Sequence, residues 1–163
     1  DGQIYISSSL FREGFKPSID LGLSVSRIGS RVQFPAIRQL GRGLRLEYAQ
    51  YREMLRMTKL RTRLSDEAED KLRRGEVLYE LFQQINSSPV SCERQVILFY
   101  AYQRKVLEVV GVPMVRRFMA DFFSYVESRV PALVDDIRAK KELTPEIRTG
   151  LDRAMGQFFK ETK

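Results

Sequence analysis

The spacing of apolar residues changes once along the chain. Over residues 3–7 and 17–25 apolar side chains recur every second residue, as Leu21, Leu23 and Val25 do, which is the period of a half-buried strand. From about Pro35 they recur every three to four residues, the period of an amphipathic helix. The sequence therefore predicts a short β segment followed by a bundle of helices.

The β segment cannot form a sheet of its own, because two strand-like pieces joined by a turn-rich stretch at residues 10–16 are too little to stand as an isolated hairpin. We expect residues 1–34 to be the edge of a larger sheet that a separate chain supplies, and residues 35–163 to be a helical domain. The predicted fold class is mainly α, a helical bundle preceded by a β-strand remnant.

Helix boundaries are marked by capping residues and by helix breakers. Starts are predicted at Ser65, Ser91 and Thr144, where a side-chain oxygen precedes acidic residues or proline. Gly75 is expected to end or bend its helix, and breaks are expected at Gly111–Pro113 and Pro131. The apolar stripes that define the helices are Leu44, Tyr48, Tyr51 and Leu55, ending near Leu60; Val77, Leu78, Leu81, Phe82 and Ile85; Val96, Phe99, Tyr100, Leu107 and Val110; Val115, Phe118, Met119, Phe122 and Val126; Leu133 and Ile137; and Ile147, Leu151, Met155, Phe158 and Phe159.

Composition excludes several kinds of chemistry. The 163 residues are 43% hydrophobic and 30% charged, which is typical of a helix-rich globular protein, and no apolar run reaches the roughly 20 residues of a membrane span. The chain has no histidine, so a catalytic triad and a histidine base are excluded. No glycine-rich phosphate loop of the G-x-x-x-x-G-K-[ST] type occurs, and Cys92 has no partner for an internal disulfide.

The net charge of +7 is concentrated in residues 31–75, which hold twelve basic and six acidic residues. Its densest part contains Arg56, Lys59, Arg61 and Arg63. A solvated helix face, an acidic partner and a nucleic-acid backbone each account for such a run. One alternative function is therefore a free-standing basic helical adaptor that binds nucleic acid through residues 31–75. That alternative leaves the N-terminal strands without partners.

Arg27 is the first candidate for chemistry. It follows the alternating segment, between Gly22 and Gly29, where a strand would leave its sheet. Its guanidinium is a permanent planar cation with several donors, the group that phosphoryl transfer uses to stabilise spreading negative charge. Pairing with a nearby carboxylate would explain the same residue without any catalytic role, and the residues alone leave both interpretations open.

The first thirty residues resemble a known family. The stretches Asp1-Gly2-Gln3-Ile4-Tyr5-Ile6, Leu10-Phe11, Gly14-Phe15-Lys16-Pro17-Ser18-Ile19 and Gly22-Leu23-Ser24-Val25-Ser26-Arg27 closely resemble the alpha subunit of the F-type rotary ATP synthase. The resemblance starts after that subunit's phosphate loop and covers essentially the whole chain. It implies a structural and regulatory half-subunit of a proton-translocating enzyme complex, not catalytic alone, assembled with the N-terminal part of the alpha subunit on a separate chain.

The resemblance also assigns site residues. It implies that Arg27 crosses to the γ-phosphate of the nucleotide in a neighbouring beta subunit, with Val25 beside the same site. In the family, a phenylalanine, an Arg-Pro pair and two glutamines line the adenine end of a second nucleotide site that does not turn over. The matching positions, of which Lys16 and Asn86 depart from the family, are Phe11, Lys16, Pro17, Gln84 and Asn86. ATP or ADP with Mg²⁺ is expected at sites shared with other chains, and no metal ligand is expected in this one.

The resemblance also bears on the rotor contact, the partner subunits and the location of the complex. Where the family carries an acidic loop facing the central stalk, this chain has the basic stretch Leu60, Arg61, Thr62, Arg63, Leu64 and Ser65. The resemblance implies beta subunits, the central-stalk gamma subunit and peripheral-stalk subunits as partners, and no nucleic acid. Contact with a membrane is expected only through the complex. The pattern around Gln157-Phe158-Phe159 favours the matrix side of the mitochondrial inner membrane, and a plastid or bacterial membrane stays open.

Overall fold

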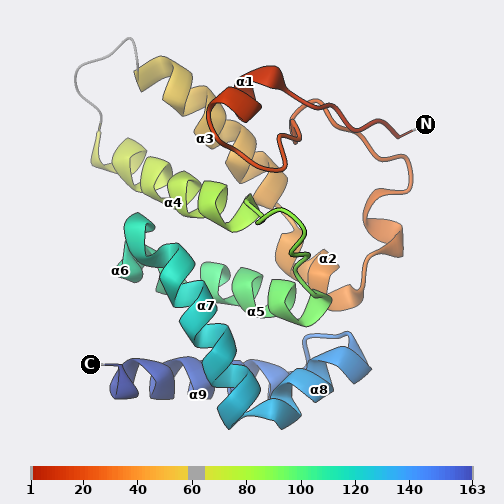
Figure 1. Ribbon diagram of the computed structural model, residues 1–163, viewed down its shortest axis with the longest axis vertical. Helices are drawn as coiled ribbons and strands as arrows, with labels where there is room; N and C mark the ends of the chain where they lie inside the picture. Colours follow the sequence, from red (N-terminus) through yellow and green to blue (C-terminus); the bar gives the residue numbers. More distant parts are fainter. Residues whose placement is uncertain (1, 59–64, 163) are drawn as a thin grey trace.

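The computed structural model describes residues 2–58 and 65–162, and it confirms a mainly α fold (Figure 1). Helices α3 and α4 pack side by side, α7 crosses α4, and α8 and α9 lie together at the end of the molecule that holds the C-terminus. No helix in the described ranges is both long and apolar enough to cross a membrane. The elements are α1 (Ser8–Arg12), the 3-10 helix η1 (Gly29–Val32), α2 (Pro35–Gly41), α3 (Leu44–Thr58), α4 (Asp66–Phe82), α5 (Cys92–Gln103), α6 (Val106–Val110), α7 (Val112–Arg129), α8 (Pro131–Lys140) and α9 (Pro145–Glu161).

The predicted apolar stripes form one continuous core. Tyr48 and Tyr51 of α3 are buried against α4, and Phe118 and Phe122 of α7 are buried with Phe158 of α9. Burying each aromatic side chain removes a large apolar area from water, so these stripes account for much of the stabilisation of the helix pairs. They belong to the core and leave no apolar face for a cofactor at these positions.

The predicted helix starts are confirmed. Ser65, Ser91 and Thr144 are the N-caps of α4, α5 and α9, and each side-chain oxygen accepts a hydrogen bond from the backbone N–H three residues on. These bonds satisfy donors that the first helical turn leaves unpaired, each worth about 1 kcal/mol. Pro131 begins α8, as predicted, and Gly111 separates α6 from α7.

The prediction that Gly75 ends or bends a helix is wrong. Helix α4 runs through Gly75 to Phe82, and the glycine faces the ring of Tyr51 on α3. A Cβ atom at Gly75 would overlap Cβ, Cγ and Cδ2 of Tyr51. Glycine is therefore needed for the close approach of the two helices, and its low helix propensity is offset by the packing of the tyrosine.

Two further expectations about apolar residues need correction. The stripe predicted from Val96 to Val110 is divided between α5 and α6, because the chain turns at Lys105, whose φ is +59°. Ile85 lies beyond the end of α4 and is 81% exposed, so it does not continue the buried face of that helix.

The N-terminal segment forms bridges where strands were predicted. Two isolated antiparallel bridges, Gln3 with Val25 and Ile6 with Ile19, are the β structure within the described ranges, and residues 8–12 form the short helix α1. A turn at residues 21–23 interrupts the predicted extended run. Leu23 and Val25 are 62% and 49% exposed, so the alternating face is not half-buried in this chain. Leu21, the first residue of the alternation, is partly buried against the helical core.

Candidate functional site

The backbone before Arg27 is tied to the N-terminal segment. Gln3 N–H donates to the carbonyl of Val25 (2.8 Å), and Val25 N–H donates to the carbonyl of Gln3 (2.9 Å). Gly2 allows this approach, because a Cβ there would lie 3.1 Å from the Val25 oxygen. The reciprocal pair fixes the point at which the chain leaves the ladder, two residues before Arg27.

A polar turn at residues 20–24 stabilises the backbone next to the Gln3–Val25 hydrogen bonds. The Asp20 carboxylate accepts hydrogen bonds from the backbone N–H groups of Gly22 (2.9 Å) and Leu23 (3.0 Å). The Ser24 hydroxyl accepts from Tyr5 N–H (3.1 Å), and Arg45 of α3 donates to the Gly22 carbonyl (3.0 Å). This Asp-centred turn is a stable local structure, so the loop that carries Arg27 is anchored both to the N-terminal segment and to α3.

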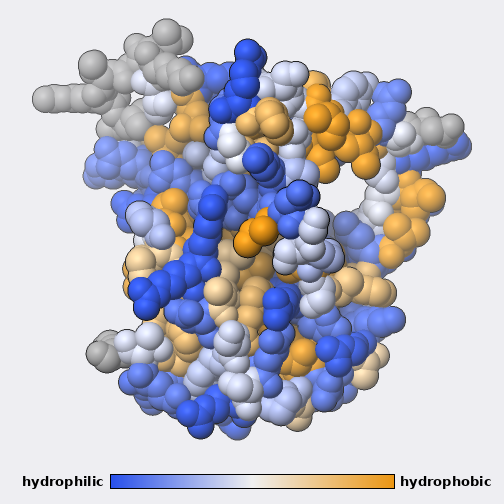
Figure 2. Space-filling view, viewed as in Figure 1, coloured by the Kyte–Doolittle hydropathy of each residue, from blue (hydrophilic) through white to orange (hydrophobic). Residues whose placement is uncertain are grey.

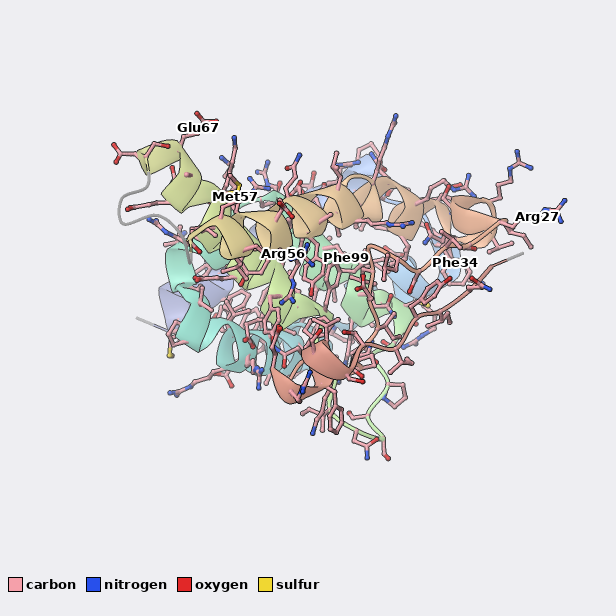
Figure 3. The ribbon with its side chains drawn as sticks, turned by 90° about the horizontal axis from the view of Figure 1, so that it is seen from above. Arg27, Phe34, Arg56, Met57, Glu67 and Phe99 are labelled. Atoms are coloured by element: carbon pink, nitrogen blue, oxygen red, sulfur yellow. The ribbon has the colours of Figure 1, made fainter. Side chains whose placement is uncertain are left out.

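Arg27 lies on the exposed loop between this ladder and η1. The Ser26 hydroxyl accepts from Gly29 N–H (2.9 Å), and Gly29 has a φ of +57°, a conformation that glycine adopts without strain. Figure 3 shows the Arg27 side chain at the margin of the molecule, directed away from the helices. Val25 and Ile28 beside it are 49% and 58% exposed. The arrangement presents a cation between apolar side chains on an anchored loop.

The second candidate site is a cavity of about 620 Å³ between the N-terminal segment and the loop after α4. The structure brings all five residues predicted for this site to its walls, although they are up to 75 positions apart in the sequence: Phe11, Lys16, Pro17, Gln84 and Asn86. The N-terminal segment and the loop after α4 are joined by a hydrogen bond from Gln84 N–H to the Lys16 carbonyl (2.8 Å).

The lining of this cavity offers distinct kinds of contact. The Lys16 ammonium lies 5.7 Å from the centre of the Phe11 ring, and the ring is 61% exposed. Gln84 and Asn86 add amide groups that donate and accept hydrogen bonds. An aromatic face, a cation and two amides suit a flat heteroaromatic ring with polar edges and a negative charge attached.

Sequence reasoning missed several residues of the cavity wall. These are mostly neighbours of the predicted ones in the loop after α4: Ile6, Ser18, Ile85, Ser87, Ser88 and Pro89. The turn-forming run Asn86-Ser87-Ser88-Pro89 was a signal for a loop at this position. Nothing in it showed that the loop would fold back over Lys16.

Behind the cavity, α1 and the following loop are fixed to the helical body. Arg52 of α3 forms a bidentate ion pair with Glu13, with Nη1 to Oε2 at 2.6 Å, and this hydrogen bonding raises the pKa of Arg52. Phe15 is fully buried, with its ring centre 4.8 Å from that of Tyr79. These contacts hold the segment that carries Phe11 and Lys16 in place.

The predicted rotor-facing stretch lies almost entirely outside the described residues. This applies to Leu60, Arg61, Thr62, Arg63 and Leu64, whereas Ser65 is the N-cap of α4. The described ends that flank the stretch carry Met57 and Glu67, and Figure 3 shows these two residues toward the end of the molecule away from Arg27.

The most strongly perturbed ionisable groups lie in the core, away from both candidate sites. Burial raises the pKa values of Tyr48 and Tyr51 to about 12, and it also raises that of Tyr102, whose hydroxyl donates to Glu47 (2.6 Å). Arg74 lies against the same pair, 3.3 Å from the Glu47 carboxylate. Within the described residues no group of three or more histidine, cysteine or carboxylate side chains is arranged to hold a metal ion.

Comparison with known proteins decides the family. A sequence profile described as "ATP synthase alpha/beta chain, C terminal domain" matches residues 33–158, which is most of the chain. The chain belongs to this family. The ATP synthase alpha/beta family assignment agrees with the resemblance found in the N-terminal motifs.

A curated relative extends the match into the segment that carries Arg27. The chain is 34% identical over 158 residues, or 97% of its length, to "ATP synthase subunit alpha" of Wolinella succinogenes. The chain spans 32% of the length of that relative. It therefore corresponds to the C-terminal portion of an ATP synthase alpha subunit. The relative is bacterial, so a mitochondrial location remains a prediction.

Proposed function

We propose that this chain is the C-terminal part of the alpha subunit of an F-type, proton-translocating ATP synthase, and that it supplies Arg27 to the ATP site of a neighbouring beta subunit. In this role the chain has no catalytic activity alone. It completes a site whose nucleotide and Mg²⁺ are held mainly by other chains. The proposed partners are the N-terminal part of the alpha subunit, beta subunits, and gamma and peripheral-stalk subunits, with membrane contact only through the complex.

The position of Arg27 carries the proposal. A group that acts on a neighbour's nucleotide must be exposed, and it must also be positioned by rigid backbone. Arg27 meets both requirements, because the Gln3–Val25 pair and the Ser26–Gly29 bond anchor its loop while the side chain points outward (Figure 3). A guanidinium there can stabilise the charge that spreads over the phosphoryl oxygens in the transition state.

The exposed apolar residues around the ladder support a neighbouring domain. Ile4, Ile6 and Leu23 are 72%, 68% and 62% exposed, and Figure 2 shows apolar area gathered over this part of the molecule. Side chains of this size are normally buried, and a contiguous exposed group marks an interaction surface. The nucleotide-binding part of the alpha subunit is the proposed cover.

Turnover of the assembled complex tests the role of Arg27. We expect Arg27→Ala to lower the rate of ATP hydrolysis at saturating ATP by about 10³-fold or more, while the affinity for nucleotide changes little, because the interaction forms chiefly in the transition state. Arg27→Lys should recover only part of the rate, since lysine keeps the charge and loses the planar fork. The control is Arg153→Ala, an exposed arginine on α9 with no ion pair in the described structure. Unchanged turnover in Arg27→Ala would refute the proposed role.

The cavity with Phe11 and Lys16 is proposed as the second nucleotide site, one that does not turn over. Its volume of about 620 Å³ is in the range of small-molecule sites, and its aromatic ring and amides suit a nucleobase. The family has arginine and glutamine where this chain has Lys16 and Asn86. We therefore expect weaker and shifted contacts with the nucleotide, because lysine cannot form a bidentate pair and asparagine is one methylene shorter than glutamine.

A further inference from the structure

A corner of the molecule next to Arg27 holds an unusual set of charges. Residues 21–46 contain five arginines and no lysine, aspartate or glutamate. Several arginines on other helices pair with carboxylates of a facing helix, as Arg94 does with Glu127 (2.8 Å) and Arg104 with Asp152 (3.0 Å). Arg31 and Arg42 form no ion pair within the described residues. Over residues 2–58 and 65–162, no carboxylate neutralises the positive charge of Arg31 and Arg42.

The corner is hollowed. A cavity of about 720 Å³ lies between η1, α2 and the start of α3, and Arg38, Arg42 and Arg45 line it together with the amides of Gln33 and Gln39. Figure 1 shows the outer loop that leads through η1 into α2, and Figure 2 shows this loop standing off from the helical body. Every charged group on the wall of the cavity is a guanidinium, so the cavity selects for an anion.

Two of these arginines are held in position by backbone carbonyls. Arg38 donates from Nε to Ser30 (2.8 Å) and from Nη2 to Arg31 and Gln33 (both 3.1 Å). Arg45 donates from Nη2 to the Gly22 carbonyl (3.0 Å). In the described structure these bonds leave Nη1 of both side chains without a partner. Guanidinium groups fixed in this way lose little side-chain entropy when they bind an anion.

The surface beside the cavity is apolar as well as basic. Ile28 and Val32 flank Arg31 on η1 and are 58% and 75% exposed. Arginine with exposed aliphatic side chains and without lysine is the composition of a protein interface. Surfaces that bind nucleic acid by charge use lysine and arginine along a phosphate backbone.

We propose that this arginine corner, defined as Ile28, Arg31, Val32, Arg38, Arg42 and Arg45, binds a carboxylate-bearing segment of a partner protein. Acidic side chains of the segment enter the cavity, and its apolar side chains cover Ile28 and Val32. The inference rests on the proposed function in one respect, because we take the partner to be the same neighbouring subunit to which Arg27 reaches.

The test compares two double variants of the alpha subunit with equal loss of charge. Arg31→Gln with Arg42→Gln removes two arginines whose side chains form no hydrogen bond or ion pair with the described part of the chain. Arg129→Gln with Arg153→Gln is the control on α7 and α9. The dissociation constant for the beta subunit is measured at 50 mM and 300 mM NaCl, and the turnover of the assembled complex is measured at saturating concentrations of both subunits. A fluorescent peptide of alternating glutamate and leucine, and a single-stranded RNA 20-mer, serve as direct probes.

We expect the first pair to weaken binding of the beta subunit and of the acidic peptide about tenfold at 50 mM NaCl, with a smaller loss at 300 mM. Turnover of the saturated complex should stay within about twofold of wild type, in contrast to Arg27→Ala. Equal effects of the two double variants, or RNA binding that depends on Arg31 and Arg42, would overturn the inference and leave the role of Arg27 standing. Conversely, a peptide that binds through these arginines while Arg27→Ala keeps full turnover would refute only the proposed function.

Discussion

The close approach of α3 to α4 at Gly75 gives a steric prediction. A Cβ on Gly75 would lie 2.2 Å from Cγ and Cδ2 of Tyr51 and 2.4 Å from its Cβ. Carbon atoms in contact stay about 3.5–4.0 Å apart, so the two helices would have to separate by about 1 Å or more. Rotating the tyrosine gives no relief, because its Cβ is fixed to the backbone.

The magnitude follows from two opposing terms. Replacing glycine by alanine inside a helix stabilises it by about 1 kcal/mol, whereas overpacking a closely packed core costs about 1–3 kcal/mol. Because the overlap includes an atom next to the backbone, we place the cost near the upper end of that range. Gly75→Ala should therefore lower the free energy of unfolding by about 2 kcal/mol.

Urea denaturation followed by circular dichroism at 222 nm measures this change. Gly156→Ala on α9 is the matched control, since nothing lies within 4 Å of a Cβ at that position. The control should raise the free energy of unfolding by up to about 1 kcal/mol. If Gly75→Ala were as stable as the wild type, the reasoning about the contact between α3 and α4 would be refuted.

Three further predictions concern pH and ligand binding. The buried Tyr48 hydroxyl has no hydrogen-bond partner among the described residues, so Tyr48→Phe should stabilise the fold by about 1 kcal/mol in urea denaturation at pH 8. Burial raises the pKa of Tyr48 to about 12, whereas a tyrosine in the unfolded chain ionises near pH 10. The wild type should therefore lose stability as the pH rises from 10 toward 12, and Tyr48→Phe should lose less. An equal loss of stability in both proteins would contradict this reasoning. Hydrogen bonds from its own backbone N–H and from Ser91 and Arg138 lower the pKa of Glu93, so Glu93→Gln should reduce stability at pH 7. The margin should shrink as the pH falls below the ordinary value of 4.5 and disappear once the pH is below the lowered pKa of the folded state. Lys16→Arg should tighten binding of a fluorescent ADP analogue severalfold through a second hydrogen bond, and unchanged binding would place the nucleotide elsewhere.

Local signals predicted most of the helical part of the fold. The caps at Ser65 and Thr144 and the break at Pro131 depend only on residues within one turn, so the sequence shows them directly. Gly75 was misjudged because its role is to accommodate Tyr51, which lies 24 positions away, and helix propensity contains no information about such a contact. The turn at Lys105 contains no glycine or proline, the residues that usually mark a turn in a sequence.

The candidate sites show the same division between local and long-range information. An exposed cation at Arg27 could be predicted from the residues around it, whereas its proposed target came only from the family resemblance. The cavity with Phe11 and Gln84 depends on a hydrogen bond between the Lys16 carbonyl and the loop after α4, which no local pattern specifies. The N-terminal strands were predicted from alternation, and within the described residues they amount to two isolated bridges. Alternation alone does not specify which strands will pair with them.

The most direct test of the account is a structure of the assembled complex with a transition-state analogue, ADP and aluminium fluoride, at the beta-subunit site. The account predicts that the Arg27 guanidinium donates to a fluoride ligand of the analogue at about 2.7–3.0 Å, across the boundary between the two subunits. Arg27 lying about 10 Å or more from the analogue, or folded back against its own helices, would contradict it.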